Sequence, residues 1–125
     1  MEFSSRKLAE VIIAAPVGQI DHPNAQELER VLTPLVDETL AARAPLVLDF
    51  SGVEYISSMG LRVLMVTAKQ MRARGSRIAV AALRPVVKEI FDIARFNHVL
   101  EVFPSLRAAL QEMSLPALAA FDAAS

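Results

Sequence analysis

The feature that most constrains the fold is a short, nearly continuous apolar run followed closely by a helical pattern. Residues 45–50 read PLVLDF, which is typical of a strand covered on both faces in a parallel or mixed sheet. After a turn at Ser51 and Gly52, apolar residues recur every three or four positions until Gly75, so this stretch predicts a helix packed on the strand. Strand and helix together indicate an α/β fold.

The same alternation continues along the rest of the chain. Apolar runs rich in Val, Ile and Ala predict strands at residues 8–17, 77–83 and 99–103, and residues 3–7 can pair with the first of these. Helical spacing predicts further helices at residues 25–40, 85–94 and 106–113. We therefore expect a mixed sheet of about four to five strands, with helices packed mainly on one side.

The helix expected at residues 25–40 has an identifiable start and one irregularity. Asn24 can cap it, and Glu27 and Glu29 then occupy its electropositive first turn. Pro34 lacks a backbone donor and clashes with the preceding turn, so it predicts a bend or a break near residues 32–33.

Composition sets limits on domain number and on function. A chain of 125 residues with 54% hydrophobic content suits one domain with one core. Thirteen basic and 14 acidic residues give no overall field for nucleic acid or an anionic membrane, so we expect no direct nucleic-acid binding. The absence of cysteine excludes disulfides and thiol catalysis. No apolar stretch resembles a signal peptide or a membrane span, so we expect a cytoplasmic protein without membrane insertion.

Ser57 and Ser58 open the helix that follows the apolar strand. The first backbone N–H groups of a helix lack intrahelical acceptors, and the helix dipole makes this end electropositive, so a phosphate is favourably received there. The plainer interpretation is that one of the two hydroxyls caps the helix. From spacing alone, the capping role is the more common one for such a pair.

The residues around this pair strongly resemble the STAS family, named for sulfate transporters and anti-sigma factor antagonists. The resemblance lies in the segments DFSGV (49–53), the serine pair, MGL (59–61), GQID (18–21) and RPVVKEIF (84–91). It implies a STAS-type single domain at residues 1–113, leaving 114–125 as a C-terminal tail that can form a short helix.

The resemblance is closest to bacterial anti-sigma factor antagonists, and it implies a function and a site. The unphosphorylated chain would bind an anti-sigma factor that is also a serine kinase, phosphorylation at Ser58 would release it, and a serine phosphatase would reset the switch. Ser58 aligns with the phosphorylated serine of the family. Many members have an acidic residue before that serine and a small one after it, whereas this chain has Ser57 and Met59, which makes Ser57 a competing acceptor. The expected partner-binding residues are Asp21, Ser57, Ser58, Met59, Gly60 and Arg62.

Other candidate sites are sparse. His22 and His98 have no metal-ligand spacing beside them, and no phosphate-cradling glycine loop is present, so we expect no metal, no cofactor and no enzymatic activity. Asp49 is expected to stabilise the turn near Ser51. Asp21 is equally explained by partner contact and by capping of the following helix. The basic residues after the serines form either a solvated helix face or a rim for an acidic partner; they are Arg62, Lys69, Arg72 and Arg74.

A second function remains open at this level. A STAS-like subunit of a membrane lipid transporter or a signalling scaffold could use the same helix face without phosphorylation. Either function is compatible with a monomer or a weak dimer.

Overall fold

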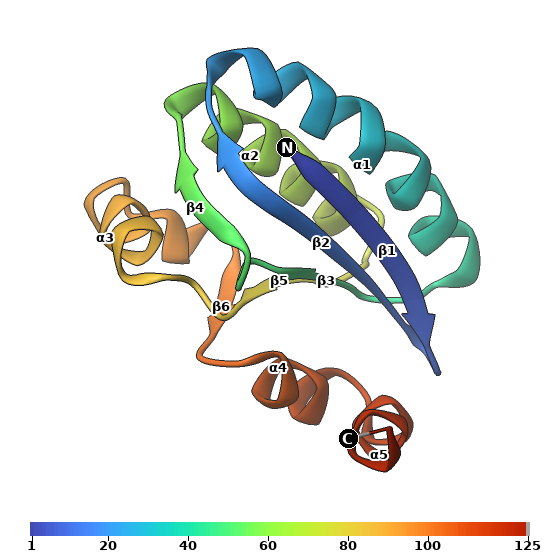
Figure 1. Cartoon of the computed structure of the whole chain (residues 1–125). Helices are drawn as coiled ribbons and strands as arrows, with labels where there is room; N and C mark the ends of the chain where they lie inside the picture. The colour runs from blue at the N-terminus through green and yellow to red at the C-terminus, as the bar shows by residue number, and fades with distance from the viewer. Residues whose placement is uncertain (125) are drawn as a thin grey trace.

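The computed structural model describes residues 1–124, which form a six-stranded mixed sheet with helices on both faces (Figure 1). The elements follow one another in the order β1 (Glu2–Leu8), β2 (Val11–Ile20), α1 (His22–Ala42), β3 (Leu46–Asp49), β4 (Val53–Ile56), α2 (Ser58–Ala73), β5 (Ile78–Ala81), α3 (Pro85–Ile93), the 3₁₀ turn η1 (Phe96–His98), β6 (Glu101–Phe103), α4 (Leu106–Met113) and α5 (Leu115–Ala123). This arrangement confirms the expected α/β class and the mixed sheet, but the sheet has six strands instead of four to five, and α4 and α5 cover its second face.

The long strand β2 organises the sheet. Val11 to Val17 pair antiparallel with β1, and Ile12 to Ala14 pair parallel with β3. The sheet continues from β3 through β5 to β6. Its last residues, Gly18 to Ile20, pair parallel with β4 instead, after a shift in register between Gly18 and Gln19. Because β2 and β4 are parallel, their carboxyl ends lie next to each other, and each leads directly into a helix.

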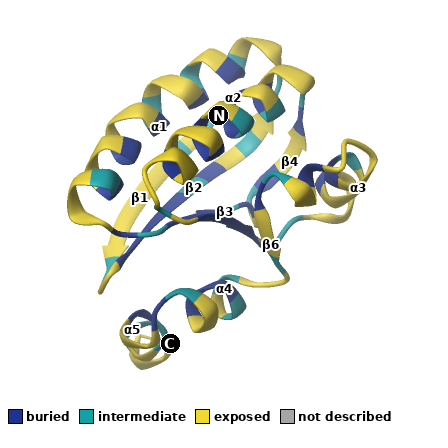
Figure 2. Cartoon of the chain, turned by 180° about the vertical axis from the view of Figure 1, so that it is seen from behind, coloured by how far each residue is buried: buried dark blue, intermediate teal, exposed yellow. Residues whose placement is uncertain are grey.

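The central strands β2, β3 and β5 are mostly buried, as their near-continuous apolar sequences predict. Along β2, Ile12 and Ala14 belong to the core under α1, α2 and α3, whereas Val11 and Ile13 belong to a second core under α4 and α5. This alternation follows from the two-residue period of a strand. Figure 2 shows that α1 and α2 bury only the side that faces the sheet and expose the other.

Helix α1 starts earlier than the sequence pattern indicates, and the expectation that Asn24 caps it is wrong. The cap is Asp21, whose Oδ1 accepts a hydrogen bond from the Asn24 N–H at 3.0 Å. The helix therefore begins at His22, and Glu27 and Glu29 lie beyond its first turn. The capping role considered for Asp21 is thus confirmed, and Pro23 in the first turn favours the same helix start.

The expected break at residues 32–33 is also absent, since α1 continues through Pro34 to Ala42. Pro34 is exposed. The carbonyl group of Arg30, which would have accepted the missing N–H bond, can therefore bind water instead.

The carboxyl-terminal segment packs on the second face of the sheet. Ser114 caps α5, and its hydroxyl lies 2.9 Å from Glu10 Oε2 in the turn between β1 and β2. Arg107 of α4 pairs with Asp122 of α5 at 3.0 Å. Residues 114–124 therefore form part of the packed fold, while residue 125 lies outside the described residues. Within residues 1–124, no helix is both long and apolar enough to cross a bilayer.

Candidate functional site

Two strand-to-helix junctions meet at one edge of the sheet and form the candidate site. The backbone N–H of Ser57 donates to the carbonyl of Ile20 at 2.8 Å, which joins the start of α2 to the end of β2. Asp21, the cap of α1, follows Ile20 directly. Asp21 and the serine pair, which are more than 30 residues apart in the sequence, are therefore brought to the same edge (Figure 1).

The two serines have different environments. Ser57 is half-buried and caps α2, because its Oγ accepts a hydrogen bond from the Gly60 N–H at 3.2 Å. Ser58 is the first helical residue and is exposed. The expected capping role is thus confirmed for Ser57, and the hydroxyl of Ser58 remains accessible.

The start of α2 can hold an anion. The N–H groups of Ser58 and Met59 occupy the first two helical positions, where no carbonyl one turn earlier can accept them. The helix dipole adds positive potential at the same end. A phosphate attached to Ser58 would therefore find N–H donors and a favourable field beside it.

Gly60 is buried and supports the site by packing. A Cβ atom at this position would lie 2.7 Å from Ile56 Cγ1 and 2.9 Å from Ile20 Cγ2. The missing side chain lets the first turn of α2 lie directly against the ends of β2 and β4. We therefore assign Gly60 to positioning of the serines.

The rim of the site contains one apolar and one basic side chain. Met59 is 40% exposed and lies beside the start of α1, where it lines a shallow hollow with His22 and Gln26. Arg62 is exposed one turn after Ser58. A partner that contacts Ser58 would meet both side chains.

The other basic residues of α2 do not join this site. The guanidinium of Arg72 donates to the Val99 carbonyl at 2.6 Å, and Arg74 caps the far end of the helix. The sequence pattern groups these residues by their spacing, whereas the fold distributes them along the 16 residues of α2. Arg62 is the member of the group that lies one turn from Ser58.

The remaining sequence expectations concern a turn and a metal. The Ser51 N–H donates to Asp49 Oδ1 at 3.0 Å, which confirms the turn-stabilising role of Asp49. Among residues 1–124, no cluster of three or more His, Asp or Glu side chains is placed to hold a metal ion.

Strand β4 and the exposed Tyr55 on it are not predicted by the sequence pattern. Tyr55 is 42% exposed and pairs in register with Gln19 of β2, so it lies just below the serine pair. The sequence signal was weak because Val53–Ile56 has only four residues, and its pairing partner is a distant part of the chain.

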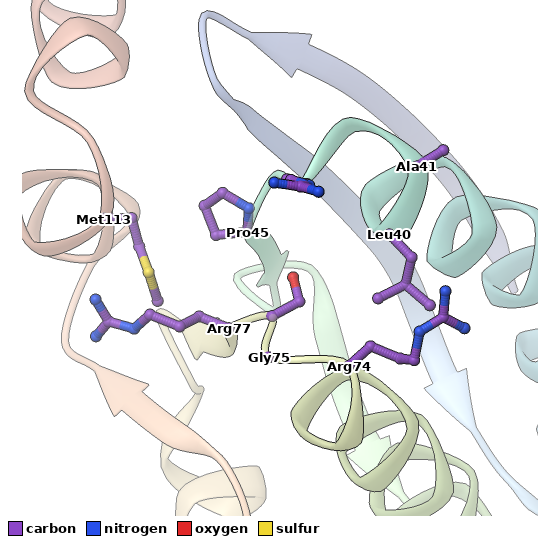
Figure 3. Close-up of a pocket in the computed structure, with 9 residues that line it drawn as sticks. Leu40, Ala41, Pro45, Arg74, Gly75, Arg77 and Met113 are labelled. Carbon is purple, nitrogen blue, oxygen red and sulfur yellow. The ribbon is translucent and has the colours of Figure 1, made fainter.

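A hollow larger than the one beside Met59 lies at the opposite end of the sheet (Figure 3). It measures about 790 Å³ and is lined by residues that include Arg43, Arg74 and Arg77. Arg77 is already engaged, because its guanidinium lies 2.5 Å and 3.1 Å from the two carboxylate oxygens of Glu101. These hydrogen bonds raise the pKa of Arg77 above its usual value. In Figure 3, Arg74 and Arg77 also point to opposite sides of the hollow, so they do not converge on one ligand position.

Comparison with known proteins agrees with this architecture. Residues 3–109 match the STAS domain family. BtrV of Bordetella bronchiseptica, provisionally described as an anti-sigma factor antagonist, is 35% identical over 109 residues, which are 87% of this chain and 91% of that protein.

Three solved structures, of two proteins, share the fold. A Thermotoga maritima protein, also provisionally described as an anti-sigma factor antagonist, has a TM-score of 0.78 at 20% identity over 89% of this chain and 93% of its own. The anti-sigma factor antagonist SpoIIAA in its unphosphorylated form has a TM-score of 0.66 at 12% identity, covering 89% of this chain and 96% of its own. The phosphorylated form of SpoIIAA from Bacillus has a TM-score of 0.63 at 12% identity, with 89% and 98% covered.

The resemblance inferred from the serine motif is thus confirmed over most of the chain, and this protein belongs to the STAS domain family.

Proposed function

We propose that this protein is an anti-sigma factor antagonist whose binding is controlled by phosphorylation of Ser58. In its unphosphorylated form it binds an anti-sigma factor that is also its serine kinase. Phosphorylation releases the kinase, and a serine phosphatase restores the binding form. The protein acts as a regulated binding partner in the cytoplasm and not as an enzyme.

The observation that carries the proposal is the division of roles between the two serines. The Ser57 oxygen is held as the cap of α2, 3.2 Å from the Gly60 N–H, whereas Ser58 is exposed in the first turn. A kinase acting on Ser57 would have to break the cap, which stabilises a helix by about 0.5–2 kcal/mol. Ser58 requires no such change. The name of BtrV, a relative with 35% identity that is provisionally described as an anti-sigma factor antagonist, supports the functional class.

The energetics favour control through the interface. A phosphate carries about −1.5 to −2 charges at neutral pH. At the exposed start of a helix, the favourable dipole interaction is only about 0.3–1 kcal/mol. Like charges brought together in a fitted interface cost several kcal/mol, and every 1.4 kcal/mol is about tenfold in affinity. The charge therefore affects partner binding more than it affects the fold.

The contact surface surrounds Ser58. Met59 contributes an apolar side chain, Arg62 a positive charge, and Ser57 and Asp21 shape the helix starts from which these side chains project. Tyr55 extends this surface onto β4, because it is exposed two residues before Ser57.

The test is incubation with a candidate serine kinase and ATP, followed by intact-mass measurement and peptide mapping. We expect one phosphate, located on Ser58, in the wild-type protein and none in Ser58→Ala. The matched variant Ser57→Ala should still accept one phosphate. A phosphate mapped to Ser57, or equal kinase affinity for the phosphorylated and unphosphorylated proteins, would contradict the proposal.

A further inference from the structure

The outer surfaces of α1 and α2 carry opposite charges. The exposed ridge of α2 is formed by Arg62, Val66 and Lys69, and Ser58–Ala73 contains no acidic residue. On α1, Glu29 and Asp37 are exposed on the side that faces α2.

The basic residue of α1 does not cancel this acidity. Arg30 lies 3.7 Å from Glu27 on its own helix, and Glu38 adds a further exposed acidic group. The helical layer therefore has an acidic half on α1 and a basic half on α2. This separation is hidden by the near-zero net charge of the whole chain.

A groove runs between the two helices from Met59 to Arg74. It consists of three hollows in a row, of which the first two share Glu29 and Val63, and the last two share Thr33, Val36 and Gln70. Val66 lines the middle hollow and is 45% exposed, and Met59 at the upper end is 40% exposed.

The hollows also show which residues of the two helices lie at the same height. Glu29 shares its hollows with Val63 and Val66, so it lies level with the part of α2 that carries Arg62. Asp37 shares a hollow with Gln70 and Ala73, so it lies level with Lys69.

We infer that the α1–α2 face is the contact between two copies of this chain, related by a two-fold axis that runs along the helices over the groove. Rotation about this axis exchanges the positions of α1 and α2 but leaves each residue at the same height along the helices. It places α1 of one copy against α2 of the second copy. Glu29 then faces Arg62 of the second copy, and Asp37 faces its Lys69. Each pair occurs twice, as the symmetry of an isologous contact requires.

The opposite orientation is unfavourable. A two-fold axis lying across the helices would place α1 on α1, and Glu29 and Asp37 of one copy would face the acidic half of the second. Charge complementarity thus favours a second copy on this face in one orientation, since like charges placed together cost several kcal/mol. Val66 and Met59 supply the apolar contact, and the charged pairs lie around it.

The contact is small, because α2 with 16 residues is about 24 Å long at 1.5 Å per residue. Interfaces of this size are weak and transient. Its ion pairs lie at the solvent-exposed rim, so salt weakens them. We therefore expect a dimer that depends on protein concentration and on ionic strength.

The experiment is sedimentation equilibrium of the full chain over a wide concentration range, at low and high salt. We expect reversible dimerisation that weakens at high salt. Asp37→Lys and Lys69→Asp should each weaken it by about tenfold or more, because each places two like-charge pairs in the dimer. Both positions are exposed, and circular dichroism checks that each variant is folded.

Two controls separate this contact from a general effect of net charge. Glu38→Lys changes charge as Asp37→Lys does, but lies about 100° further round the helix. Lys7→Asp on strand β1 matches Lys69→Asp. Both control variants should dimerise as the wild type does.

Mixing the two weakened variants provides the decisive outcome. In a mixed dimer, the substituted position 37 of one copy faces the substituted position 69 of the second copy, and the two charges are opposite. At the other contact, the native Lys69 and Asp37 face each other. Association should therefore return to nearly the wild-type level. A wild-type protein that stays monomeric at millimolar concentration would overturn the inference. So would single variants that dimerise normally, or a mixture that does not associate. No kinase enters the experiment, so its failure is independent of the proposed function.

Discussion

The two ends of α2 differ in what they leave available for binding. At the amino-terminal end, an exposed hydroxyl on Ser58 lies beside backbone N–H groups that have no partner within the helix. At the carboxyl-terminal end, Gly75 and Ser76 donate to the carbonyls of Arg72 and Met71, so the helix is closed by its own hydrogen bonds. We call the amino-terminal end of α2 its open end and the carboxyl-terminal end its closed end. The arginine-lined hollow lies at the closed end, and the unused N–H donors lie at the open end.

Under the proposed function, unsatisfied polar groups indicate the site better than the volume of a hollow does. The arginine-lined hollow presents Arg77, but Glu101 already holds that guanidinium. The serine end has little volume, yet a phosphate added there meets donors that no other group uses. The following changes test whether the two ends differ as described.

The largest effect is expected for charge added at the open end. Ser58→Asp should lower affinity for the kinase partner by tenfold or more, because the carboxylate enters the contact surface. Ala41→Asp adds the same charge beside the arginine-lined hollow and should change this affinity little. The measurement is titration calorimetry with the partner. Equal effects of the two changes would remove the distinction between the ends.

The next effect concerns the glycines at the two ends of α2. Gly60→Ala should lower the free energy of unfolding by about 1–3 kcal/mol, since its Cβ would overlap Ile20 and Ile56. Gly75 has no neighbour within 4 Å but has a φ of +73°, so Gly75→Ala should cost about 1 kcal/mol through backbone strain alone. Urea denaturation measures both. A larger loss at Gly75 than at Gly60 would contradict the packing role of Gly60.

A smaller effect separates the two serines. Ser57→Ala should lower the free energy of unfolding by about 0.5–2 kcal/mol, because it removes the cap bond to the Gly60 N–H. Ser58→Ala, at an exposed position, should stay within about 0.5 kcal/mol of the wild type. Thermal unfolding at matched conditions compares them, and a reversed order would assign the cap to Ser58.

The smallest effect is expected at the ion pair of the closed end. Glu101→Gln should lower the free energy of unfolding by less than about 1 kcal/mol, because both side chains are 45% exposed and solvent screens them. The pKa of Arg77 is raised by this pair, so the stabilisation is lost only as the pH rises through the raised pKa. The contribution of the pair should therefore be constant near neutral pH. Urea denaturation at low and high salt tests this. A loss that high salt does not reduce would contradict an electrostatic origin.

Elements with a strong local pattern were predicted well. The helix expected at residues 106–113 is α4 with the same bounds, because its apolar spacing and the capping Ser105 lie within one short segment. Capping of α2 by one serine of the pair was also predicted, since a cap depends on residues three positions apart.

Elements that depend on distant partners were predicted poorly. Strand β4 was missed because its pairing with β2 stabilises it, and four residues carry little periodic signal. Pro34 was expected to bend or break α1. The helix continues through it, because packing of Leu28, Leu32 and Leu35 in the core supports it on both sides.

The sequence by itself determined the family, the class of fold and the serine pair at the start of a helix, because these depend on neighbouring residues and on local spacing. Only the tertiary structure decided which serine is exposed, that Asp21 lies at the same edge, and that Arg72 and Arg74 lie away from it. It also separated the acidic surface of α1 from the basic surface of α2. These properties depend on how β2, β4 and the helices pack, and that packing joins residues more than 30 positions apart.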